Sequence, residues 1–117
     1  MRLLQRLVLF AAVAALVAGC RSRLNPQQAE GEHLYDVRCA HCHEDNDLGL
    51  KTPPPNLHGL FNHASLPSGQ AASDQVVARE VLSGRGLMPA FAGRFTDEQM
   101  AALLAYLHTD MHAARTE

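Results

Sequence analysis

The sequence predicts an all-α domain with three to five helices. Three stretches begin with residues that favour the first turn of a helix, and they start near Asn25, Ser73 and Thr96. Each start is followed by apolar residues three or four positions apart, which places them on one face of a helix. No stretch shows the regular alternation of polar and apolar residues that is typical of a half-buried strand. The 117 residues are enough for one such domain.

The first helix is predicted from Pro26 to about Cys39. Asn25 suits the N-cap, Pro26 suits the first helical position, and Gln28 is placed to close a capping box. These signals are local, because each depends only on residues within one turn of the helix start.

The apolar side of this first helix contains Leu34 and Val37, with Tyr35 beside them. Gly31 lies in the middle of the helix, where glycine costs about 1 kcal/mol relative to alanine. A glycine at such a position lets another helix approach closely, although a tolerated surface glycine would give the same pattern.

Two further helices are predicted. One follows Ser73 as its N-cap and covers residues 74–82, and the other opens with Thr96 at the N-cap and Gln99 at the third position, then fades near Met111. Their apolar faces follow helical spacing. These faces contain Val77 and Val81 in the first helix, and Met100, Leu103, Leu104 and Leu107 in the second.

Residues 39 to 43 form a Cys-x-x-Cys-His motif, which is the signature of covalent haem attachment. On one turn of helix, positions three apart share a face, so Cys39 and Cys42 can both form thioethers with the vinyl groups of one haem. His43 follows directly and is predicted to be the proximal ligand of the iron. The predicted fold is therefore three to five helices wrapped around one covalently bound haem.

The iron of a haem has two axial positions, and His43 fills one of them. Met88 lies in a loop fixed by a glycine before it and a proline after it, so the loop can hold a thioether in place. His58 and His63 stay open as alternatives that would give two imidazole ligands. The remaining methionines and histidines fit less well, because they lie on helices, inside the motif or near the C-terminus: His33, His41, Met100, His108, Met111 and His112.

The N-terminal segment, residues 1–19, is predicted to be a signal peptide. Arg2 and Arg6 give it a positive start, and residues 7–18 form an apolar run too short to span a bilayer comfortably. The run ends in Leu-Val-Ala-Gly before Cys20, which resembles the bacterial lipobox, and the alternative is an ordinary secretory segment cut near Gly19. Lipidation of Cys20 would also explain an odd number of cysteines in an exported protein.

These signals divide the chain into four parts. Residues 1–19 are the lipoprotein signal peptide, 20–25 the lipidated N-terminus and linker, 26–113 the haem domain, and 114–117 a C-terminal tail. The predicted location is the bacterial cell envelope, facing the periplasm, with the choice between inner and outer membrane left open.

The chain resembles the small class I monohaem cytochromes c of bacteria. The resemblance is carried by Cys39, Cys42 and His43, and by three further segments: Pro-Asn-Leu-His-Gly-Leu at 55–60, Met-Pro-Ala-Phe at 88–91, and the last predicted helix from 96 to 107. It covers about residues 27–109.

This resemblance implies specific roles. The carbonyl of Pro55 would accept a hydrogen bond from the N–H of His43, Met88 would be the distal ligand, and Gly31 and Tyr35 would meet Leu103 and Tyr106. No tryptophan is present to bind a haem propionate, so Arg85 and Arg94 are only candidates for that role.

The predicted function is one-electron transfer by a membrane-tethered carrier with His/Met ligation, rather than an enzyme. Its partners would be a redox donor and acceptor, both expected at the membrane, and no small-molecule substrate is expected. The formal net charge of −2 gives no basic field for nucleic acid. The alternatives are a haem-based enzyme or gas sensor with a labile distal ligand, and a zinc site built on the motif cysteines and two histidines.

Overall fold

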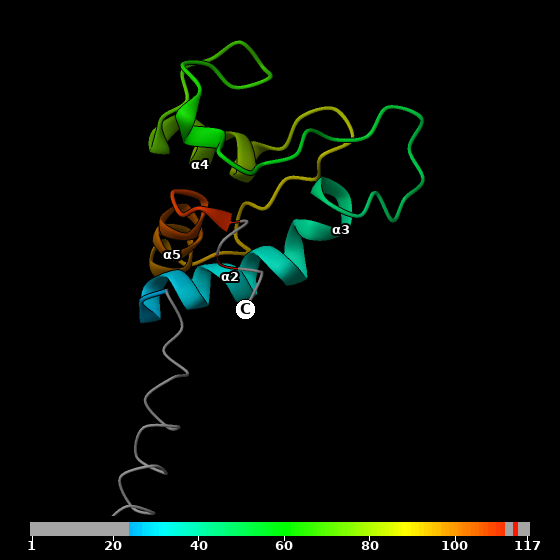
Figure 1. Cartoon of the computed structure of the whole chain (residues 1–117). Coiled ribbons are helices and arrows are strands. Elements are labelled where there is room, and N and C mark those ends of the chain that lie inside the picture. Colours follow the sequence, from blue (N-terminus) through cyan, green and yellow to red (C-terminus); the bar gives the residue numbers. More distant parts are fainter. Residues whose placement is uncertain (1–23, 112–113, 115–117) are drawn as a thin grey trace, which may run out of the picture.

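The computed structural model describes residues 24–111 and 114, and it consists of helices joined by loops (Figure 1). Within this part of the chain the backbone forms no strand longer than an isolated bridge, so the predicted all-α fold is confirmed. The elements are α2 (Pro26–Arg38), α3 (Ala40–His43), the 3₁₀ helix η1 (Leu60–Asn62), α4 (Asp74–Ser83) and α5 (Asp97–Leu107).

The helix starts lie where local side chains predicted them. At α2, Asn25 Oδ1 accepts from the backbone N–H of Gln28 at 2.8 Å, and Gln28 Oε1 accepts from the backbone N–H of Asn25 at 3.0 Å. The same reciprocal capping box joins Thr96 and Gln99 at the start of α5. These contacts satisfy N–H groups that have no partner inside the helix, and α4 uses the hydroxyl of Ser73 in the same way.

The contact between α2 and α5 is the main helix pairing of the fold, and the two helices cross closely (Figure 1). A side-chain carbon added at Gly31 would overlap the carbonyl oxygen of Ala102 and would lie 2.7 Å from Cβ of Tyr106. Next to this point the rings of Tyr35 and Tyr106 pack at 5.5 Å between centroids, and both residues are fully buried. The mid-helix glycine is therefore explained by close approach, as expected.

The buried face of α2 differs from the expected one. Gly31, Leu34 and Tyr35 are buried, whereas Val37 is 49% exposed. The prediction that Val37 lies on the packed face of α2 is therefore wrong, because Val37 lies on the side of α2 that faces away from α5.

The C-terminal segment also differs from expectation. α5 ends at Leu107 instead of fading near Met111, because Thr109 donates both its backbone N–H and its hydroxyl to the carbonyl of Tyr106, at 2.8 and 2.6 Å. The chain turns there, and Met111 returns to the core with 1% of its surface exposed. Met111 is therefore a core residue rather than part of a fraying end.

His108 follows α5 and is exposed, yet its side chain has two partners. Its ring stacks on Phe61 at 3.8 Å between centroids, and Nε2 lies 2.6 Å from Oδ1 of Asp74. His108 therefore joins the end of α5 to η1 and to the start of α4.

The predicted signal peptide and Cys20 lie outside the described residues, as do residues 112, 113 and 115–117. Among the helices that are described, none has the length and apolar character required to cross a bilayer.

Candidate haem-binding site

The Cys-x-x-Cys-His motif forms its own short helical turn, α3, at the end of α2. Cys39 separates the two helices with φ −120° and ψ −43°, and its carbonyl accepts hydrogen bonds from the backbone N–H groups of Cys42 (3.1 Å) and His43 (2.9 Å). Both cysteines are free thiols with partly exposed surfaces. One turn of backbone therefore presents two thiols and an imidazole together, as the expected covalent attachment requires.

Burial raises the pKa of the Cys39 thiol to about 11, and the neighbouring Cys42 adds to this shift while Arg38 opposes it. Cys39 therefore remains a neutral thiol at neutral pH. The zinc alternative would need two further ligands beside Cys39 and Cys42. Within the described residues, no cluster of three or more His, Cys, Asp or Glu side chains could hold a metal ion.

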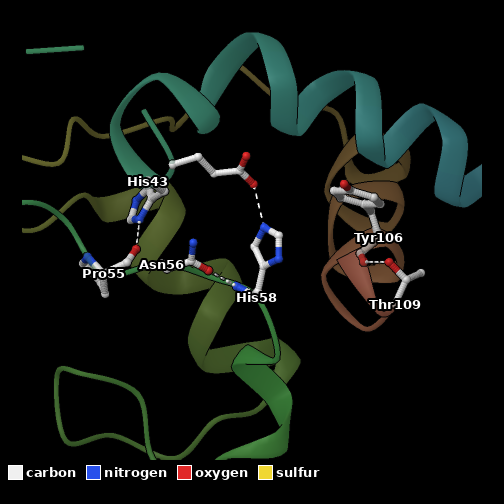
Figure 2. Close-up of polar contacts among 7 residues, drawn as sticks. His43, Pro55, Asn56, His58, Tyr106 and Thr109 are labelled. Carbon is white, nitrogen blue, oxygen red and sulfur yellow. Dashed lines mark hydrogen bonds and ion pairs between the residues drawn. The ribbon is translucent and has the colours of Figure 1, made fainter. Parts of the chain in front are cut away.

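His43 is oriented by a backbone carbonyl twelve residues further along the chain. Its Nδ1–H donates to the oxygen of Pro55 at 2.7 Å (Figure 2), the contact that the resemblance implied. Because Nδ1 carries the proton in this contact, Nε2 is the ring nitrogen left with a free lone pair for iron. The motif residues therefore fit a covalently bound haem, with Cys39 and Cys42 as attachment points and Nε2 of His43 as a metal ligand.

The carbonyl of Pro55 belongs to a segment whose backbone is stiff. Three consecutive prolines at 53–55 fix the backbone φ angle and supply no N–H donors. Directly after them, Asn56 Oδ1 accepts from the backbone N–H of His58 at 2.8 Å, which forms a tight local turn.

The loop that contains Met88 is held against the end of α4 by backbone hydrogen bonds. Arg85 and Met88 exchange two backbone hydrogen bonds of 3.1 and 2.9 Å, and Phe91 donates its backbone N–H to the carbonyl of Val81 at 3.1 Å. Met88 is half-buried and packs against the hydrophobic core, as do Cys39 and Leu57. The loop therefore holds a thioether beside the same core that Cys39 contacts.

The two alternative imidazoles have different environments. Nε2 of His58 lies 2.8 Å from Oε1 of Glu44, and the two side chains are only 15% and 17% exposed. His63 is exposed and follows η1. His41, inside the motif, contacts Asp47 at 2.9 Å on the surface. Both His58 and His41 therefore contact a carboxylate, and only the His58 contact is shielded from solvent.

The two arginines considered for propionate binding are both on the surface. The side chain of Arg85 is 58% exposed and lies 3.6 Å from Glu80, and Arg94 is also exposed. A third arginine, Arg38, was not singled out from the sequence. Its guanidinium lies 5.9 Å from the ring centre of Phe95, and this contact joins α2 to the segment before α5.

Two other residues near the site were not singled out from the sequence. Glu44 directly follows the motif, and its carboxylate contacts the ring of His58. Gly84 ends α4, and a Cβ there would lie 2.7 Å from the carbonyl oxygen of Met88.

Known proteins resemble this chain over most of the described residues. Residues 26–107 match the family described as "Cytochrome C oxidase, cbb3-type, subunit III". Cytochrome c6 from Picosynechococcus sp. is 32% identical over 81 residues, which are 68% of this chain and 69% of that protein. Cytochrome c6 from Thermosynechococcus vestitus is 32% identical over 96 residues, covering 82% of this chain and 81% of the relative.

A solved structure supports the same relationship. Cytochrome c6 from the diatom Phaeodactylum tricornutum aligns with a TM-score of 0.53 at 27% identity, over 74% of this chain and 97% of the diatom protein. The shared fold extends across nearly the whole of that protein.

Proposed function

We propose that the chain, which belongs to the small monohaem class I cytochromes c, is a one-electron carrier. Members of this family have one covalently bound haem c, and so does this chain. The relatives named cytochrome c6 support this function. A bound haem would supply the one-electron chemistry, and the polypeptide would hold the iron ligands in place and keep water away. The protein is then an electron carrier, not an enzyme.

His/Met ligation of the iron is the part of the proposal that decides between carrier and sensor. The histidine half rests on the hydrogen bond of 2.7 Å between Nδ1 of His43 and the oxygen of Pro55, which leaves Nε2 free to bind a metal. Met88 would be the distal ligand: backbone hydrogen bonds hold its loop against the end of α4, and the competing His58 already contacts Glu44. A site with both axial positions filled favours electron transfer over binding of a substrate or gas.

The test of the carrier function is a potentiometric titration of the purified holoprotein, with haem content measured as the pyridine haemochrome. We expect one haem per chain and a single reversible one-electron transition at a positive potential, as a thioether ligand favours Fe(II). A potential typical of two imidazole ligands would contradict the His/Met assignment.

Gly84 provides a matched test of how the Met88 loop is held. A Cβ at Gly84 (φ +70°) would meet the backbone of Met88 and Ala90, whereas one at Gly86 (φ +57°) would meet nothing within 4 Å. Both alanine variants are strained, because both glycines have a positive φ, and the strain is larger at Gly84, whose ψ of 171° places it in a region that essentially only glycine adopts. Only Gly84→Ala should also displace the loop and weaken the far-red sulfur-to-iron absorption band. Equal bands in the two variants would contradict this account.

The tether to a membrane through Cys20 also remains a proposal, supported by the sequence from Leu16 to Cys20. Between Cys20 and Pro26 the chain can reach roughly 20 Å when extended, which would keep the haem close to the membrane surface. Several acyl chains make anchoring stable. The donor and acceptor are then redox proteins in or near the same membrane, on the periplasmic side.

The Cys20→Ser variant should move from the membrane fraction to the soluble periplasmic fraction, because it offers no thiol for lipidation. The control is Gly19→Ala, which keeps a small residue before Cys20 and should stay with the membrane. Fractionation followed by haem staining measures both. A Cys20→Ser protein that remained in the membrane fraction would contradict the anchor.

A further inference from the structure

Two consecutive residues at the end of α3 hold the same segment of chain. His43 donates from Nδ1 to the oxygen of Pro55 at 2.7 Å, and Glu44 accepts from Nε2 of His58 at 2.8 Å. Figure 2 shows these two contacts side by side, with the chain from Pro55 to His58 running between them. The segment is therefore attached to α3 at two points rather than one.

The second point is shielded from solvent, unlike another histidine–carboxylate contact in the same region. The side chains of His58 and Glu44 are 15% and 17% exposed, whereas those of His41 and Asp47 are 63% and 55% exposed. Contacts between exposed charged groups contribute little, because water competes with them and long side chains must be ordered. The His58–Glu44 contact is therefore the one that can fix backbone position.

The short chain between the two points transmits this constraint. Pro55 has a fixed φ angle, and the side chain of Asn56 closes a turn onto the backbone N–H of His58 at 2.8 Å. Only two residues separate Pro55 from His58, so a His58 side chain held by Glu44 limits how far the carbonyl of Pro55 can shift.

We propose that His58 and Glu44 form a positioning pair, which holds the carbonyl of Pro55 against Nδ1–H of His43. This inference rests on the proposed function, in which His43 binds the iron. A hydrogen bond at Nδ1 makes the imidazole a stronger donor to a metal, and a stronger donor stabilises Fe(III) more than Fe(II). The pair therefore helps to keep the reduction potential lower than it would be with a loose Pro55 carbonyl.

The experiment compares three variants as holoproteins. His58→Leu removes the contact to Glu44, His58→Gln keeps a side chain that can donate to it, and His41→Leu breaks the exposed contact to Asp47 as a matched control. The first readout is the solvent exchange rate of the His43 Nδ1–H, measured by NMR in the reduced protein. The second is the reduction potential.

We expect His58→Leu to exchange this proton about tenfold faster, the effect of losing one hydrogen bond to a charged group, and to have a more positive potential. His58→Gln and His41→Leu should stay close to the wild type in both measurements. The backbone N–H of Leu103 lies in the buried contact of α5, so its exchange rate reports global unfolding. Comparing the two exchange rates separates a local effect at His43 from a general loss of protein stability.

The proposal is overturned if His58→Leu leaves the His43 exchange rate and the potential unchanged, or if the His43 rate rises only as much as that of Leu103. It is also overturned if His41→Leu has the same effects as His58→Leu. If His43 did not bind the iron in the wild-type protein, the proposed function itself would be contradicted. Spectra of the wild-type holoprotein would show this before any variant is made.

Discussion

Replacing Met88 by leucine should remove the far-red sulfur-to-iron band of the oxidised protein. It should also lower the reduction potential by on the order of 0.1 V, since axial ligands move haem potentials over roughly 0.8 V in total. Leucine has nearly the volume of methionine, so the loop should keep its backbone contacts to α4 while the sulfur is lost. Visible spectroscopy and potentiometry measure the two effects.

The matched control for this prediction is Met100→Leu. Met100 is buried on α5 and belongs to the core, so the same substitution there should leave the band and the potential unchanged. A band that persisted in the Met88 variant would mean that another side chain binds the iron. Loss of the band in the Met100 variant instead would assign the ligand to α5.

Gly31→Ala should destabilise the protein by about 3 kcal/mol, within the range of severe overpacking. The new methyl group would overlap the carbonyl of Ala102, and a backbone group cannot rotate away as a flexible side chain can. α2 and α5 would have to separate, and the packing of Tyr35 on Tyr106 would loosen. Denaturant unfolding of the holoprotein, followed by circular dichroism, measures the change.

The sign of this effect separates packing from helix propensity. Alanine is better than glycine in a helix by about 1 kcal/mol, so propensity alone predicts that Gly31→Ala stabilises the protein. The control is Ala29→Gly at an exposed position of the same helix, which should cost about that amount. A Gly31→Ala protein that was more stable than the wild type would contradict the close contact between α2 and α5.

The parts of the fold that the sequence predicted well depend on neighbours within one turn. The caps at Asn25, Ser73 and Thr96 lie where expected, because each helix start is determined by its own side chains. The contact between His43 and Pro55 was also expected, but from a family resemblance rather than from local chemistry. The family resemblance thus predicted a contact between residues twelve positions apart, which helix propensity could not predict.

The parts that escaped prediction depend on tertiary packing. Met111 lies near the end of the sequence, and only the turn at Thr109 brings it back into the core. His108 stacks on Phe61, more than forty residues away in the sequence, and no local pattern indicates that pairing. The contact of His58 with Glu44 has the same origin, since two polar residues in separate loops meet only after the segment around Pro55 folds over α3.

Carbon monoxide shows whether two protein side chains occupy both axial positions of the haem iron, as the proposed electron transfer requires. The gas is added to the reduced, purified holoprotein at neutral pH, and the Soret absorption band is followed. We expect an unchanged spectrum, because Met88 and His43 would occupy both axial positions. Rapid formation of a carbon monoxide adduct in the wild-type protein would contradict it and would favour a sensor or an enzyme.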